Sequence, residues 1–173
     1  MAPVIERRLV LLRHAKSARP HGVPDHDRPL AGRGRRDAQA AGDWFVSEGP
    51  RPDLVLSSSA VRARHTWEIV CRSFPRMPRV TVEPRLYGAR PIDVLRLARG
   101  ADADVHVLLL VGHEPTLSET VLGMSGKGSD RSAMRAVRHK YPTTGIAVLR
   151  FRGPWAGLQP GGAVLESFVV PRG

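Results

Sequence analysis

Two short, almost wholly apolar runs constrain the fold of this chain more than any other feature. They are RLVLL at residues 8–12 and VHVLLLV at residues 105–111. Runs of this length and composition are typical of strands that are buried on both faces, as in a parallel sheet covered by helices. Both are far shorter than the ~20 residues that a membrane-spanning helix needs. We therefore expect an α/β fold and no interaction with a membrane.

Segments with helical spacing separate the strand-like runs. Ala38, Ala41 and Phe45 recur at helical spacing, which predicts a helix over about 35–47. Similar spacing predicts further helices at 63–74, at 92–99 and after Pro115. The remaining predicted strands lie at 53–58, 79–84, 145–151 and 163–170. Strands that alternate with helices imply βαβ units, so we predict a three-layer α/β/α sandwich around a mostly parallel sheet, with residues 1–173 in a single domain.

One segment, at about 124–142, does not fit this alternation. It is polar and basic, with glycines near its start, and we predict a basic flap or insertion there. If residues 129–139 were helical, Arg131, Arg135 and Arg138 would share one face. That face would be either a solvated charged surface or a clamp for an acidic substrate or partner.

The chain is strongly basic, with 27 Lys and Arg against 16 Asp and Glu, a net charge of +11. Nearly all of the basic residues are arginine, whose planar guanidinium suits phosphate and carboxylate. The charges are either spread over a solvated surface or form a positive field that attracts a phosphorylated or acidic partner. Aromatic residues make up only 5%, and no zinc-finger or RNA-platform signature is present, so we expect no nucleic acid partner.

The single cysteine and the first residues bear on location. Cys71 has no second cysteine with which to form an intramolecular disulfide, which fits a reducing compartment. The N-terminal MAPVIERRLV carries charges where a signal peptide would need an apolar stretch. We therefore expect a cytoplasmic protein, and the sequence predicts no particular oligomeric state.

Chemically reactive side chains follow four of the predicted strands. Arg13-His14 follows the first strand, Ser57-Ser58-Ser59 with Arg62 follows the second, Glu83 follows the third run, and Gly112-His113 follows VHVLLLV. The carboxyl ends of parallel strands meet at one edge of a sheet, where ligands bind, so we expect these groups to converge.

This set of residue types suits phosphoryl transfer. A neutral imidazole can attack phosphorus while two guanidiniums hold the non-bridging oxygens. Nearby positive charge lowers the pKa of a histidine and so keeps its lone pair free at neutral pH. A second imidazole can donate to the charge that builds on the transferred group. Because the guanidiniums supply positive charge, we expect no metal and no other cofactor.

Four motifs carry a family resemblance. LVLLRHAKS, DRPLAGRG, SSSAVRARHT and VGHEPTLS occur in this order between Leu9 and Ser118, and together they resemble the histidine phosphatase (phosphoglycerate-mutase-like) superfamily. The variant RHAKS and the short chain resemble its SixA-type phosphohistidine phosphatase branch. The resemblance implies that His14 is the nucleophile and that Arg13, Arg62 and His113 complete the phosphate pocket. It also implies that the Ser17 hydroxyl lies near the phosphate.

The resemblance leaves the role of Glu83 open. Many superfamily members place an acid after the third strand to protonate an alcohol leaving group, whereas SixA-type members lack it at that position. Here the spacing from Glu83 to Tyr87 differs by one residue from the mutase pattern. A phosphohistidine leaving group can take its proton on the imidazole ring, so Glu83 is a candidate proton donor that the chemistry does not require.

The expected function is therefore a metal-independent phosphatase with a phosphohistidine enzyme intermediate, acting on phosphohistidine in a protein. One alternative is a small-molecule phosphomonoesterase or mutase with Glu83 as the acid, whose substrate would be a small phosphorylated molecule. Another is a non-catalytic polyanion-binding module that exploits the net charge of +11. The cluster of His21, Asp25, His26 and Asp27 fits no metal-site template, and we expect it to be a solvated loop.

Overall fold

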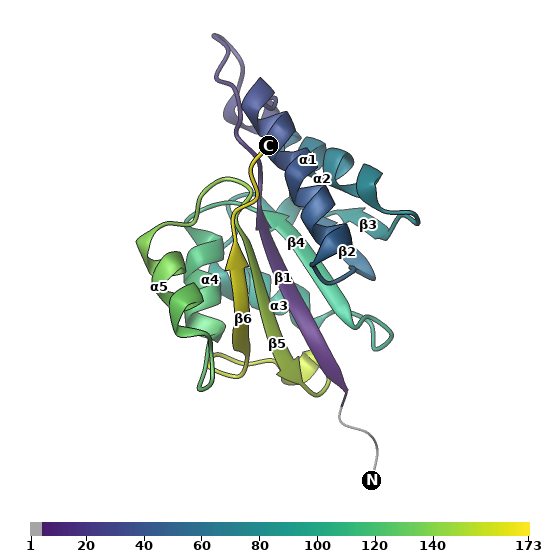
Figure 1. The fold of residues 1–173 in the computed structure, drawn as a ribbon, viewed down its shortest axis with the longest axis vertical. Coiled ribbons are helices and arrows are strands. Elements are labelled where there is room, and N and C mark those ends of the chain that lie inside the picture. The colour runs from purple at the N-terminus through teal and green to yellow at the C-terminus, as the bar shows by residue number, and fades with distance from the viewer. Residues whose placement is uncertain (1–4) are drawn as a thin grey trace.

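The computed structural model describes residues 5–173. Its six strands form one sheet in the order β3-β2-β4-β1-β5-β6 (Figure 1). The strands are β1 (Glu6–Arg13), β2 (Leu54–Ser57), β3 (Arg79–Val82), β4 (Val107–Gly112), β5 (Ile146–Arg152) and β6 (Val164–Val169). Strands β1 to β4 pair in parallel, and only β5 runs antiparallel to its neighbours β1 and β6. The prediction of a mostly parallel sheet is confirmed.

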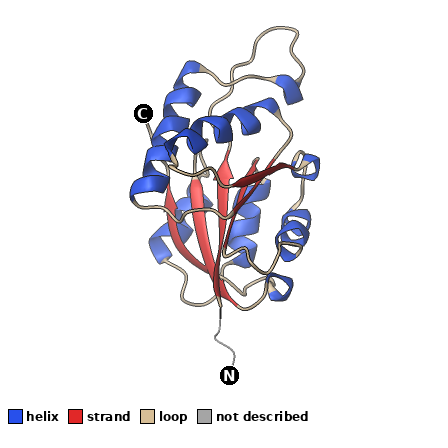
Figure 2. Ribbon diagram, turned by 90° about the vertical axis from the view of Figure 1, so that its right-hand side faces the viewer, coloured by secondary structure: helices blue, strands red, loops and turns tan. Residues whose placement is uncertain are grey.

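Helices cover both faces of the sheet (Figure 2). They are α1 (Gly32–Ser47), α2 (Val61–Val70), α3 (Pro91–Arg99), α4 (Thr116–Met124) and α5 (Arg131–His139). Alternate residues of β1 point to opposite faces, because the side-chain period of a strand is two. Val10 and Leu12 pack with α1 and α2, whereas Leu9 and Leu11 pack with α3, α4 and α5. The predicted α/β/α sandwich is therefore present. No helix in the described residues 5–173 is long and apolar enough to cross a membrane.

The basic segment 124–142 contains a helix that packs into the core. The Asp130 carboxylate accepts a hydrogen bond from the backbone N–H of Ala133 at 2.7 Å and so caps the start of α5. Ala133 and Val137 are buried against the core, while Arg131 and Arg135 remain exposed. The segment for which we expected a flap or insertion thus adds a helix to one layer of the sandwich, with its basic face toward solvent.

The carboxyl ends of the three central parallel strands lie side by side. Arg13 pairs with Gly112, and Ser57 pairs with Val111. The residues that follow these strand ends, among them His14 and His113, therefore begin at the same edge of the sheet. The long loop from Ala15 to Ala31 leaves this edge and returns to it, since Ser17 and Leu30 form an antiparallel bridge.

Candidate active site

His14 directs one ring nitrogen to a backbone carbonyl and the other into the site. Its Nδ1 lies 2.8 Å from the carbonyl oxygen of Ala15. A carbonyl can only accept, so Nδ1 carries the proton and the lone pair lies on Nε2. The guanidinium Nε of Arg62 donates to that Nε2 at 3.3 Å. The lone pair on Nε2, which we predict to be the nucleophile, therefore points toward the guanidinium of Arg62.

The surroundings keep both site histidines neutral. The pKa of His14 is lowered to about 3, chiefly by burial and also by the nearby His113, Arg62 and Arg13, against the opposing effect of the Ala15 carbonyl. Burial and then the charge of Arg62 lower the pKa of His113 to about 4, with Asp25 opposing them. Both imidazoles are therefore uncharged at neutral pH, as expected of groups that are buried beside cations.

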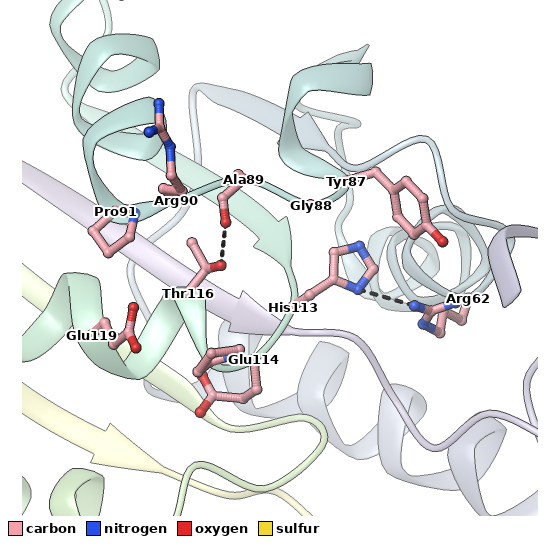
Figure 3. A pocket seen from close by; sticks show the side chains of 11 residues that line it. Arg62, Tyr87, Gly88, Ala89, Arg90, Pro91, His113, Glu114, Thr116 and Glu119 are labelled. Atoms are coloured by element: carbon pink, nitrogen blue, oxygen red, sulfur yellow. Dashed lines mark hydrogen bonds between the residues drawn. The ribbon is translucent and has the colours of Figure 1, made fainter.

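Arg62 lies between the two imidazoles. It comes from the first turn of α2 and is buried. Its Nη2 is 3.5 Å from Nδ1 of His113, a contact drawn in Figure 3. The His113 ring lies 5.1 Å from the His14 ring, between centroids, and its Nε2 is 2.7 Å from the hydroxyl of Ser58 at the end of β2. Residues from three strand ends and one helix thus meet within a single cluster.

A cavity of about 220 Å³ opens over His14. Arg13, Ser17 and Arg62 line it, as the sequence predicted for neighbours of the phosphate. Sequence reasoning missed three further cations of the lining, which are Lys16, Arg19 and Arg28. Arg13 donates to the carbonyl of Tyr141 at 2.7 Å, and Arg28 donates to the Ser17 hydroxyl. Five cationic side chains against the single carboxylate of Glu114 make this cavity suited to a phosphoryl dianion.

Asp25 of the long loop pairs with two guanidiniums that line this cavity. It belongs to the short 3₁₀ helix η1 (Asp25–Asp27). Its backbone carbonyl and its carboxylate accept from Nη1 and Nη2 of Arg62 at 2.7 and 3.1 Å. The carboxylate also accepts from Arg28 and from the Tyr87 hydroxyl, both at 2.8 Å. The hydrogen bonds from Tyr87 and Arg28 hold the pKa of Asp25 well below its usual range.

The loop at residues 21–27 is largely exposed, as predicted, and so is Asp25, but its carboxylate also orients two guanidiniums of the site, which sequence reasoning missed. Only the presence of an aspartate in a polar loop could have suggested it, and that signal is weak. The four residues His21, Asp25, His26 and Asp27 do not gather around one point. Within residues 5–173, no group of three or more His, Cys, Asp or Glu side chains could hold a metal ion.

Glu83 lies apart from the other predicted site residues. Its two carboxylate oxygens accept from the Arg85 guanidinium, each at 2.8 Å, and one also accepts from the Arg85 backbone N–H. The hydrogen bonds from Arg85 lower the pKa of Glu83 and so favour the carboxylate over the acid. The structure brings Arg13, His14, Ser17, Arg62 and His113 together around one cavity and leaves Glu83 outside its lining.

A wider cavity of about 530 Å³ adjoins the first. Arg62, His113 and Glu114 line both. Figure 3 shows its wall, in which the loop with Tyr87 and Gly88 faces His113 and the N-terminal residues of α3 and α4 continue away from it. The site thus consists of a cationic pocket over His14 with a larger open space beside it.

Comparisons with known proteins agree with this geometry. A sequence model described as histidine phosphatase superfamily (branch 1) matches residues 9–90. An uncharacterised protein from Mycobacterium tuberculosis, Rv1276c, is 44% identical over 162 residues, which cover 93% of this chain and 100% of that protein.

Two solved structures are also similar over nearly the whole chain. The candidate phosphohistidine phosphatase SixA from Nakamurella multipartitia is 34% identical, with a TM-score of 0.85 and 98% of both chains covered. The corresponding SixA structure from Agrobacterium tumefaciens is 32% identical, with a TM-score of 0.77 and coverage of 95% of this chain and 99% of that one. The chain belongs to the histidine phosphatase superfamily, and its resemblance to the SixA-type branch is confirmed.

Proposed function

We propose that this protein is a metal-independent phosphatase that removes the phosphoryl group from phosphohistidine in a protein, through a phosphohistidine intermediate on His14. The main support for the proposal is the pairing of Nδ1 of His14 with the Ala15 carbonyl at 2.8 Å, which leaves the lone pair on Nε2, facing Arg62 in the cationic cavity. Membership of the histidine phosphatase superfamily supports a phosphatase, and the similarity to SixA structures supports the choice of substrate.

In the first step, Arg13, Arg28 and Arg62 hold the non-bridging oxygens of the substrate phosphoryl group. Nε2 of His14 forms a bond to phosphorus while the bond from phosphorus to the substrate nitrogen breaks. The electron pair of that bond leaves with the substrate imidazole, which has taken a proton on its ring. No carboxylic acid is needed for this leaving group, which is consistent with a Glu83 that Arg85 holds as a carboxylate.

In the second step, water attacks the phosphorus of phospho-His14, and the bond between phosphorus and Nε2 breaks. Its electron pair returns to Nε2, and the proton lost by the water goes to the phosphate that leaves. We propose that His113 donates a hydrogen bond to the phosphoryl group in both steps, because a bound dianion raises the pKa of a neighbouring imidazole. The guanidiniums already supply positive charge to the transferred group, so we propose that the reaction needs no metal.

Brief incubation with a radiolabelled phosphohistidine peptide tests this proposal. We expect acid-labile labelling of the wild-type protein, also in the presence of a chelator. His14→Ala should remove the label and lower turnover by at least ~10³-fold, because no other group can form the covalent intermediate. His113→Ala should still become labelled, but slowly.

His139→Ala is the matched control, since His139 is exposed on α5 and should leave labelling unchanged. Turnover of His14→Ala near the wild-type rate would contradict the assignment of the nucleophile. Activity that a chelator removes and a divalent ion restores would contradict the metal-independent mechanism. Phosphate binding without any turnover would favour the polyanion-binding alternative.

A further inference from the structure

A third cavity lies beyond the two at the candidate active site. Its volume is about 190 Å³, and it lies between α3 and α4. It shares Pro91 and Glu119 with the cavity of about 530 Å³, which in turn shares Arg62 and His113 with the cavity over His14. The three cavities are therefore neighbours in a row, and the residues that they share lead from the pocket over His14 past the N-terminal end of α3 to α4.

The far end of this row is apolar, in contrast to the cationic pocket at His14. Leu95 and Met124 are buried and form part of its lining. Ile92 stands at its rim with 40% of its surface exposed. Gly123 of α4 also lines it, and a Cβ added there would meet no atom within 4 Å, so this glycine leaves space that a side chain would fill.

We propose that this row binds a segment of the phosphohistidine-bearing protein, with the phosphohistidine in the pocket over His14 and an apolar side chain of the same protein between α3 and α4. This inference rests on the proposed function. The lining residues shared with the cavity over His14 support it, because the wider cavity beside that pocket offers space for the rest of a substrate anchored at His14. A small phosphorylated molecule would occupy the first two cavities and would leave the apolar end uncovered. A peptide segment fills all three, since specificity pockets for side chains commonly adjoin the site that holds the anchoring group.

Synthetic phosphohistidine peptides test the apolar contact directly. In one series the peptides carry a single leucine at successive positions from five residues before to five residues after the phosphohistidine, with alanine elsewhere. We expect wild-type kcat/KM to be about tenfold higher for leucine at one or two of these positions, the scale for burying part of one leucine side chain. Equal kcat/KM for the whole series, with the all-alanine peptide included, would overturn the proposal.

Two variants test whether that preference arises in the cavity between α3 and α4. Gly123→Leu fills the space, and Ile92→Ser removes the apolar rim. Both should abolish the leucine preference while hydrolysis of p-nitrophenyl phosphate, which is too small to reach this cavity, stays within about twofold of wild type. Gly123→Ala adds one methyl group and should retain most of the preference, and Val46→Ser trims an exposed apolar side chain of α1 and should retain all of it.

A leucine preference that persists in Gly123→Leu and Ile92→Ser would overturn the proposal. An equal loss of activity on peptides and on p-nitrophenyl phosphate would also overturn it, because the two residues would then act on the structure of the site. Failure of the proposed function itself is distinguishable, since the wild-type protein would then hydrolyse p-nitrophenyl phosphate but none of the phosphohistidine peptides.

Discussion

At the scale of single residues, Asp25 places a negative charge next to two guanidiniums that line a pocket suited to an anion. Its carboxylate would repel a phosphoryl dianion, yet it also fixes the guanidiniums of Arg62 and Arg28 through charge-assisted hydrogen bonds. Removing the charge therefore has two opposite effects. Phosphate binding becomes electrostatically easier, whereas the orientation of the guanidiniums at the reacting group becomes less defined.

We predict that Asp25→Asn lowers kcat by about tenfold, the scale of one charge-assisted hydrogen bond lost from a positioning residue, while inorganic phosphate inhibits as well as before or better. Steady-state kinetics with p-nitrophenyl phosphate, together with the inhibition constant of phosphate, separate the two effects. Asp27→Asn is the matched control, because Asp27 is exposed and pairs with His26 instead. A kcat of Asp25→Asn within twofold of wild type would show that Asp25 does not position the guanidiniums.

Glu83 is the other residue whose role a single substitution can decide. Because Arg85 holds it as a carboxylate and it does not line the pocket over His14, we predict that Glu83→Gln changes kcat/KM for phosphohistidine peptides and aryl phosphates by less than about threefold. Alkyl phosphates should be poor substrates of the wild-type protein, because their leaving groups need an acid. Efficient hydrolysis of alkyl phosphates that falls by ~10²-fold in Glu83→Gln would instead favour a phosphomonoesterase or mutase with Glu83 as the acid.

At the scale of elements, the site depends on how closely α1 approaches the loop that follows β1. Gly34 lies in the first turn of α1 and is buried against that loop, and a Cβ added there would overlap the backbone carbonyl oxygen of Lys16. The neighbouring Ser17 and Lys16 line the cationic pocket. The absence of a side chain at this one position therefore allows the helix and the loop to fix the pocket wall together.

We predict that Gly34→Ala lowers the free energy of unfolding by about 1–3 kcal/mol, because backbone atoms must move to relieve the overlap. It should also lower kcat/KM, since the displaced loop carries Ser17. Gly32→Ala in the same helix is the control, as its added Cβ would lie 3.9 Å from the nearest atom, at the end of the Arg36 side chain. Urea denaturation and p-nitrophenyl phosphate hydrolysis measure both effects, and equal results for the two variants would contradict the packing argument.

At the scale of the whole molecule, the buried histidines couple folding to pH. Burial lowers the pKa of His14 to about 3 and that of His113 to about 4, both below the usual value of 6.5. At pH values between the lowered pKa of each histidine and its usual value of 6.5, the unfolded chain binds a proton that the folded protein does not bind. Acid therefore favours unfolding. The folded state is therefore stabilised above about pH 6.5, and this contribution is lost as the pH falls toward 4 and then 3.

We predict that the free energy of unfolding falls between pH 7 and pH 4 with a slope of up to about 1.4 kcal/mol per pH unit for each of the two histidines. Urea denaturation at several pH values gives the slope. His113→Asn removes one titrating ring and should make the dependence shallower, whatever its effect on stability at pH 7. The same slope in the variant and the wild-type protein would show that His113 does not titrate as its burial implies.

Much of the fold and of the candidate site was predictable from the chain alone. Apart from Arg8 and His106, the runs at 8–12 and 105–111 contain only apolar residues, so they indicated central strands, and β1 and β4 are indeed adjacent. The carboxyl ends of parallel strands lie at the same edge of the sheet. For this reason the sequence predicted that Arg13, His14, Arg62 and His113 lie close together. The four motifs then predicted the family, because their order and spacing can be read directly from the sequence.

The tertiary structure decided what depends on side-chain direction and on the return path of loops. Nothing in the spacing of Glu83 predicted that Arg85 would pair with it, and nothing in the loop at 15–31 predicted that Asp25 would hold Arg62. The segment 124–142 contains a packed helix, α5, because Ala133 and Val137 find apolar partners from distant parts of the chain. Strand periodicity is a local property that a sequence displays directly, whereas these contacts join residues far apart in the chain and exist only once the chain has folded.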